Sequence, residues 1–165
     1  MSMKEKSVQC LGKTGFHKIA YTEWGSPDAA RTLICVHGLT RNGRDFDVLA
    51  SALEESYRII CPDIAGRGRS DWLASGKHYY NPNYLADLAT LLAHVGAREV
   101  DWLGTSMGGI LGMLMASMNN SPAATNNITV NTTGDGDEIG RAVVKALNEF
   151  TRRNGDRASR AFYGD

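Results

Sequence analysis

One stretch of the sequence constrains the fold most, because it joins a strand-like segment to a helix-like segment with almost no connection. Residues 100–103 read VDWL, residues 104–109 read GTSMGG and residues 110–118 read ILGMLMASM. This order predicts a buried strand, a tight turn and an apolar helix. Ser106 lies at the centre of the turn, where small neighbours relieve crowding, so its hydroxyl is expected to project from the end of a sheet.

Similar strand–helix alternations precede this stretch. Short apolar runs of the kind buried on both faces of a parallel sheet alternate with helical spacing: strands are expected over 32–36, 58–61 and 100–103, and helices over 45–54, 82–95 and 109–118. Residues 4–25 carry two strand-like stretches separated by GKTG, which predicts an antiparallel hairpin. The sequence therefore predicts the α/β class, with a mostly parallel sheet and helices on both faces.

The composition shifts after residue 118. Residues 119–127 are rich in Asn, Ser, Ala and Pro and are expected to form a linker between residues 1–118 and a tail over 128–165. In the tail, residues 128–133 alternate like a strand and residues 138–153 have helical spacing. We expect the tail strand to pair beside the strand over 100–103, which would otherwise form an open apolar edge.

Composition and charge narrow the classes of partner. Lys plus Arg and Asp plus Glu both number 18, so the formal net charge is zero and gives no electrostatic reason to expect nucleic acid or an anionic membrane as partner.

The three cysteines fit no metal site, so reduced, buried thiols are expected. No signal peptide is visible, the longest apolar segment is too short to cross a bilayer, and neither metal nor cofactor is expected. These features favour a cytoplasmic protein of unspecified oligomeric state.

The chemistry centres on the G-x-S-x-G turn. Ser106 is the candidate nucleophile, and the start of the following helix directs the backbone N–H of Met107 toward the place where an oxyanion would develop. A second N–H is needed, and Leu39, in the His37-Gly38-Leu39 sequence after the first apolar run, is the candidate donor. Residues 62–70, after the next run, are expected to shape the rim of the site, since no helix begins there to bind phosphate.

Three segments, in this order and spacing, resemble the amino-terminal half of the α/β-hydrolase superfamily: HGLTRNGRDFDVLA, YRIICPDIAGRGRSDW and VDWLGTSMGGILGM. The resemblance covers residues 16–118 and is closest to bacterial esterases and carbon–carbon-bond hydrolases. It implies a truncated α/β-hydrolase fold and a small ester-like substrate. It also implies Ser106 as nucleophile, with the N–H groups of Leu39 and Met107 as the oxyanion hole.

The sequence departs from this family after the serine. The family's order is Ser, then Asp or Glu, then His, but no histidine follows Ser106. We therefore identify no triad acid or histidine and expect an impaired serine hydrolase. Two substitutes for the missing residues are considered and expected less: a loop histidine as base (His37 or His78), or a tail carboxylate as the acid (Asp135, Asp137 or Glu138). We expect both loop histidines to be solvated side chains instead. The alternative is a non-catalytic truncated or chimeric protein, because residues 127–155 weakly resemble carboxyl-terminal segments of phage tail tape-measure-like proteins.

Overall fold

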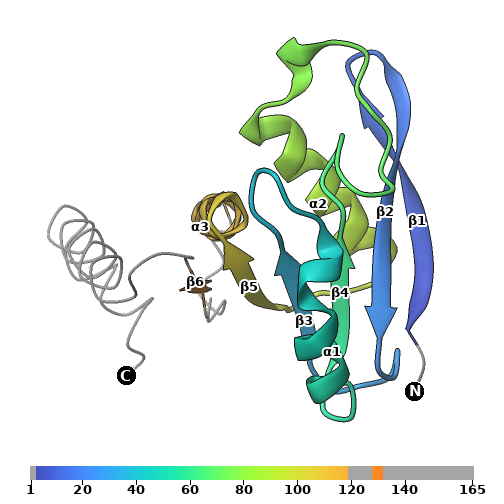
Figure 1. The fold of residues 1–165 in the computed structure, drawn as a ribbon, viewed down its shortest axis with the longest axis vertical. Coiled ribbons are helices and arrows are strands. Elements are labelled where there is room, and N and C mark those ends of the chain that lie inside the picture. Colours follow the sequence, from blue (N-terminus) through green and yellow to red (C-terminus); the bar gives the residue numbers. More distant parts are fainter. Residues whose placement is uncertain (1–2, 119–127, 132–165) are drawn as a thin grey trace, which may run out of the picture.

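A sheet of six strands with helices on both faces forms the framework of the residues described by the computed structural model, 3–118 and 128–131 (Figure 1). The strands lie in the order β1-β2-β4-β3-β5-β6. Their bounds are β1 Lys4–Gly12, β2 Gly15–Trp24, β3 Thr32–Val36, β4 Arg58–Pro62, β5 Asp101–Thr105 and β6 Ile128–Asn131. The α-helices are α1 Asp47–Leu53, α2 Asn81–His94 and α3 Met107–Met118, and two 3₁₀ turns are η1 Gly43–Phe46 and η2 Gly76–His78.

The expected hairpin and the expected parallel strands are both confirmed. Strands β1 and β2 pair antiparallel from Lys4 opposite Glu23 to Gly12 opposite Gly15. Gly15 has a φ of +117°, which glycine adopts without steric cost. Strand β2 joins the rest of the sheet by pairing antiparallel with β4, whereas β4, β3, β5 and β6 run parallel.

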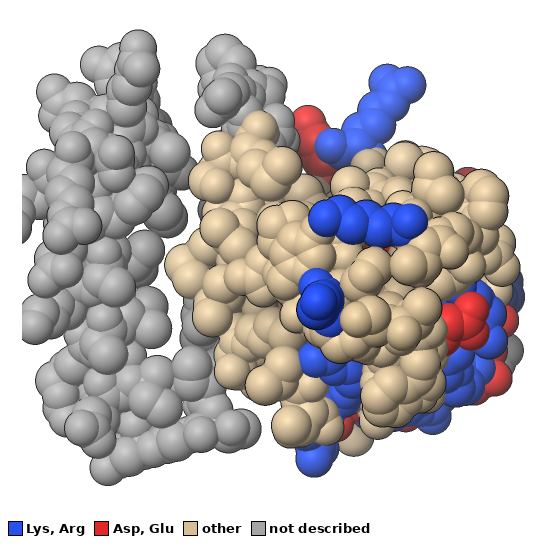
Figure 2. Space-filling model, turned by 90° about the horizontal axis from the view of Figure 1, so that it is seen from above, with Lys and Arg blue, Asp and Glu red and all other residues tan. Residues whose placement is uncertain are grey.

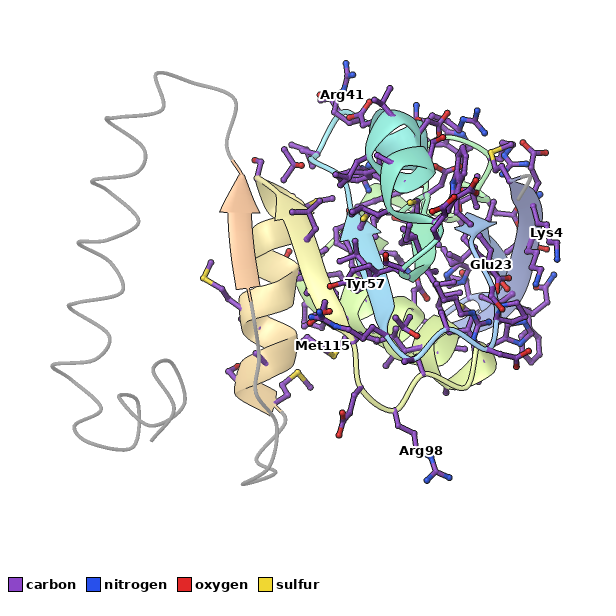
Figure 3. All side chains as sticks on the ribbon, turned by 90° about the horizontal axis from the view of Figure 1, so that it is seen from below. Lys4, Glu23, Arg41, Tyr57, Arg98 and Met115 are labelled. Carbon is purple, nitrogen blue, oxygen red and sulfur yellow. The ribbon has the colours of Figure 1, made fainter. Side chains whose placement is uncertain are left out.

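Alternating side chains of the central strands explain why both faces of the sheet are covered. Ile34 and Ile60 belong to the larger core cluster, to which α2 and α3 also contribute. Their neighbours Cys35 and Cys61 belong to a smaller cluster on the face covered by α1. Figure 3 shows α1 on the opposite side of the sheet from α2 and α3. All three cysteines are unpaired and buried, as expected.

The tail strand lies where the sequence predicted it. Strand β6 pairs parallel with β5, with Trp102 opposite Ile128, and so covers the edge that β5 would otherwise expose (Figure 1). Its bounds are shorter than the predicted 128–133. The predicted linker over 119–127 and the predicted helix over 138–153 lie outside the described residues.

Several other elements also have bounds that differ from prediction. The segment expected as one helix over 45–54 begins instead with η1, whose Asn42 side chain accepts a hydrogen bond from the N–H of Arg44, and continues as α1. Strand β5 extends to Thr105, so the turn after it is a single residue. Among the described helices, none combines the length and apolarity needed to cross a membrane.

Candidate active site

Ser106 is the single residue between the end of β5 and the start of α3. Its φ is +50°, and it is the only non-glycine residue with a positive φ in the described part of the chain. Its carbonyl accepts hydrogen bonds from the N–H groups of Gly109 at 2.9 Å and Ile110 at 3.1 Å, which starts the helix directly after the bend. The residue is exposed, and it lies at the end of the sheet where the carboxyl termini of the parallel strands meet. The sharp bend predicted from the sequence is therefore present.

Glycines at two positions make this bend sterically feasible. A Cβ on Gly104 would lie 2.4 Å from the carbonyl carbon of Gly108 and from the nitrogen of Gly109. A Cβ on Gly108 would lie 2.0 Å from the carbonyl oxygen of Val36 in β3. The indole N–H of Trp102 donates to the carbonyl of Gly108 at 3.0 Å and fixes the first turn of α3 against the sheet. The glycines thus permit close packing of strand, bend and helix.

The loop after β3 lies against the same bend. A Cβ on Gly38 would lie 3.5 Å from the carbonyl oxygen of Thr105 and 3.6 Å from the Cβ of Ser106. Leu39 follows with an exposed side chain, whereas the side chain of Met107 is buried at the start of α3. The first N–H groups of a helix have no acceptor within that helix, so α3 itself does not use the N–H of Met107, the residue next to the serine. The structure therefore brings the segments of all three predicted site residues together.

His37 is buried, and the expectation of a solvated loop histidine is wrong. Its exposed fraction is 0%. Its Nε2 accepts the backbone N–H of Ile64 at 2.9 Å, so in the neutral ring Nδ1 carries the proton and donates to the carbonyl of Gly38 at 2.7 Å. Burial lowers the pKa of His37, an effect that the hydrogen bond to Gly38 only partly opposes. Both ring nitrogens are occupied, which leaves neither to accept a proton from Ser106.

The two bonds to Gly38 also orient the next peptide group. The carbonyl of Gly38 accepts from His37 Nδ1 and from the N–H of Arg41, the latter at 3.1 Å. This carbonyl belongs to the same planar peptide unit as the N–H of Leu39, and the two groups point in opposite directions. Fixing the carbonyl therefore fixes the direction of the N–H that was predicted to bind an oxyanion.

Asp63, at the end of β4, ties the surrounding loops together. The carboxylate is buried and accepts two backbone N–H bonds, from Gly43 and from Arg69, each at 2.8 Å. The backbone carbonyl of Asp63 accepts a hydrogen bond from the hydroxyl of Ser70 at 2.6 Å. The oxygen of that hydroxyl accepts a hydrogen bond from the N–H of Ala20 at 2.8 Å. The roles of His37 and Asp63 were missed from the sequence. The available signal was a polar residue directly after a buried apolar strand.

The remaining histidines lie on other elements. His17, on β2 as expected, is buried and its Nε2 lies 2.9 Å from both carboxylate oxygens of Asp87 on α2. Burial raises the pKa of Asp87, and the bond to His17 opposes that shift. His78 is half-buried in η2, and His94 is exposed at the end of α2, as expected. Within the described residues, the hydroxyl of Ser106 has no hydrogen-bond partner and no cluster of metal-ligating side chains occurs.

Comparison with known proteins identifies the family to which this fold belongs. A family model described as "alpha/beta hydrolase fold" matches residues 31–162. The chain belongs to this family. A 3-hydroxybutyrate-oligomer hydrolase from Cupriavidus necator is 55% identical over 115 residues, which are 70% of this chain and 39% of the relative. The chain thus spans well under half the length of this curated relative.

Two solved structures of hydrolases resemble the described fold. A putative hydrolase from Rickettsia typhi matches with a TM-score of 0.69 and 32% identity, over 86% of this chain and 52% of that one. An α/β hydrolase from Novosphingobium aromaticivorans also matches with a TM-score of 0.69 and 32% identity, over 85% and 48% of the two chains. These similarities confirm the predicted fold class and a likeness to hydrolases.

Proposed function

We propose that this chain acts on esters or related acyl compounds as a serine hydrolase, with Ser106 as the nucleophile. The observation that carries the proposal is the conformation of Ser106, an exposed serine at a φ of +50° on a one-residue bend between strand β5 and helix α3. A non-glycine residue in this conformation carries strain, which proteins retain at sites where a side chain must be presented in one direction. Family membership supports the same role.

The proposed reaction begins when the hydroxyl oxygen of Ser106 attacks the carbonyl carbon of the ester. An oxygen–carbon bond forms, the hydroxyl proton leaves, and the substrate's carbonyl oxygen becomes an oxyanion. The N–H groups of Leu39 and Met107 are the proposed donors to that oxyanion. The bond to the alcohol then breaks, the alcohol takes up a proton, and an acyl group remains on Ser106. Water then attacks the acyl carbon, the bond from that carbon to Ser106 breaks, and a carboxylic acid leaves while the serine oxygen regains a proton.

We assign no base for this reaction. No histidine follows Ser106 in the sequence, and His37 already uses both ring nitrogens for Ile64 and Gly38. Loss of a triad member lowers kcat of a serine protease by roughly 10⁴- to 10⁶-fold. We therefore expect this chain to react slowly, with the hydroxyl proton passing to water or buffer.

The proposed substrates are short esters of hydroxy acids. The support is the 55% identity to a protein named as a 3-hydroxybutyrate-oligomer hydrolase. The face seen in Figure 2 is mostly uncharged, with scattered Lys and Arg and with Asp and Glu toward its margins, which suits an uncharged substrate. A small molecule, rather than nucleic acid or membrane, is the proposed partner, in agreement with the formal net charge of zero. Buried, unpaired cysteines support a cytoplasmic location.

A fluorophosphonate probe tests the nucleophile without requiring turnover. The serine oxygen forms a bond to phosphorus, the phosphorus–fluorine bond breaks, and fluoride leaves while the hydroxyl proton goes to solvent. We expect one labelled site, which is lost in Ser106→Ala and retained in Ser117→Ala, since Ser117 is an exposed serine near the far end of α3. Hydrolysis of a 3-hydroxybutyrate dimer is then measured in both variants. A cooperatively folded chain that takes up no probe at Ser106 would favour the non-catalytic alternative.

A further inference from the structure

We infer that Arg67 is a positioning residue for the oxyanion hole, because it binds the peptide unit after the α-carbon of Leu39, whereas His37 binds the one before it. This inference rests on the proposed function. The Nε–H of Arg67 donates to the carbonyl oxygen of Leu39 at 3.0 Å. Its Nη1 donates to the carbonyl of Ala65 at 2.8 Å and to the hydroxyl of Tyr84 at 3.0 Å. One guanidinium thus joins the Leu39 loop, its own loop and α2.

The guanidinium is itself held firmly. Its central carbon lies 5.2 Å from the ring centroid of Tyr84 and 5.8 Å from that of Tyr79. Tyr84 is part of the larger core cluster and only 3% exposed, so it cannot follow a moving loop. A planar guanidinium that packs near aromatic rings holds its N–H donors in one geometry, which a lysine ammonium does not provide.

The backbone around Arg67 is shaped to present this side chain. Gly66 and Gly68 flank it with φ values of +76° and +52°. A Cβ on Gly68 would lie 2.2 Å from an oxygen of the Asp63 carboxylate. The N–H of Arg67 donates to the carbonyl of Ile64 at 2.9 Å and closes a turn. The protein backbone therefore places Arg67 beside the loop that carries Leu39 before any substrate binds.

Leu39 needs such support because its side chain is 58% exposed and cannot anchor it by burial. On one side, His37 and Arg41 fix the carbonyl of Gly38, which shares a peptide unit with the N–H of Leu39. On the other side, Arg67 fixes the carbonyl of Leu39 itself. Both peptide units that flank the α-carbon of Leu39 are therefore restrained, and the N–H keeps one direction before any substrate binds.

Arg69 provides a matched control, since it lies two residues away in the same loop. Its side chain pairs with Glu5 on β1 rather than with Leu39, and 41% of it is exposed. Lysine replacement at either position keeps the charge and the length of the loop. Only Arg67→Lys removes the hydrogen bonds that the guanidinium donates to Leu39, Ala65 and Tyr84.

The experiment measures phosphonylation of Ser106 by the fluorophosphonate in the full chain and its variants. Saturation kinetics separate the maximal rate constant from the apparent binding constant of the probe. We expect Arg67→Lys to lower the maximal rate constant roughly 10- to 100-fold, as small misplacements of catalytic groups do, with little change in probe binding. Tyr84→Phe should give a smaller decrease, and Arg69→Lys should match the wild type.

Hydrogen exchange of residues 37–41 provides a second readout that does not depend on reactivity. Exchange should be faster in Arg67→Lys than in Arg69→Lys while both variants retain the thermal transition of the wild type. Equal rates of phosphonylation in Arg67→Lys and Arg69→Lys would overturn this inference alone and leave Ser106 as the nucleophile. An unreactive wild-type chain would overturn the proposed function and, with it, the role of Arg67.

Discussion

Ile64 donates its backbone N–H to the Nε2 of His37 at 2.9 Å, and this bond decides which ring nitrogen carries the proton. A backbone N–H can only donate, so Nε2 must accept and Nδ1 must be protonated in the neutral ring. Nδ1 then donates to the carbonyl of Gly38 at 2.7 Å. A doubly protonated ring would have two donors and would lose the bond to Ile64. The loop beside Ser106 therefore depends on a neutral His37.

We expect the free energy of unfolding to decrease with falling pH because of His37. Burial lowers its pKa in the folded chain below the ordinary value of 6.5, so the unfolded chain binds the proton first. Its contribution is fully present above pH 6.5 and is lost as the pH falls toward the folded-state pKa. Urea unfolding at a series of pH values from 7.5 to about 5 measures this dependence.

The control for this prediction is His37→Gln, whose amide can accept from Ile64 and donate to Gly38 but does not titrate. The other groups, including Asp87, are common to both chains, so their effects cancel in the difference between wild type and variant. Parallel pH dependences for the two chains would contradict the assigned role of His37.

Much of the fold was predictable because strand burial leaves a direct signal in the sequence. The apolar runs over 32–36 and 58–61 became β3 and β4, which are buried on both faces. The bend at Ser106 was predictable for a similar local reason, since a strand, a G-x-S-x-G turn and a helix follow one another without interruption. Pairing of β6 with β5 followed from the need to cover an open edge.

The parts that escaped prediction depend on contacts between segments distant in the sequence. Periodicity cannot show that the ring of His37 meets Ile64, or that Arg67 reaches Leu39. A histidine after a strand has the same local pattern whether it is solvated or buried. Only the juxtaposition of the loops after β3 and β4 decides between these states, and that juxtaposition arises from parallel pairing of the strands.

We expect Gly108→Ala to destabilise the chain by about 1 to 3 kcal/mol, toward the upper end of the range for overpacking. The added methyl group would lie 2.0 Å from the carbonyl oxygen of Val36. Backbone hydrogen bonds restrain both segments, since β3 pairs with β5 here and the carbonyl of Ser106 accepts from Gly109 and Ile110 at the start of α3. Gly76→Ala is the control, because a Cβ there meets no atom within 4 Å. Chemical denaturation should show a change of at most about 0.5 kcal/mol for the control. Equal losses for the two variants would argue against close packing at the bend.

Asp63→Asn is expected to cost about 1 to 3 kcal/mol of stability, because one buried backbone donor loses its acceptor. Each carboxylate oxygen of Asp63 accepts a separate N–H, from Gly43 and from Arg69, whereas an amide offers only one oxygen. Asp71→Asn is the comparison. Asp71 is 47% exposed and accepts only one backbone N–H, from Lys18, which an amide oxygen can still accept. Denaturation midpoints of the two variants measure the difference, and a milder effect at Asp63 than at Asp71 would contradict this account.

Replacing Ser106 by glycine and by alanine separates the strain at the bend from the chemistry of the hydroxyl. Both variants lack the proposed nucleophile, so neither should be labelled by a fluorophosphonate. Alanine must still adopt a φ near +50°, which costs an L-residue about 1 to 2 kcal/mol, whereas glycine adopts it freely. Glycine also gives the unfolded chain more freedom, which offsets up to about 1 kcal/mol of that gain. We therefore expect Ser106→Gly to be about 0.5 to 1 kcal/mol more stable than Ser106→Ala. A glycine variant less stable than the alanine variant would mean that the left-handed bend at Ser106 does not exist in solution.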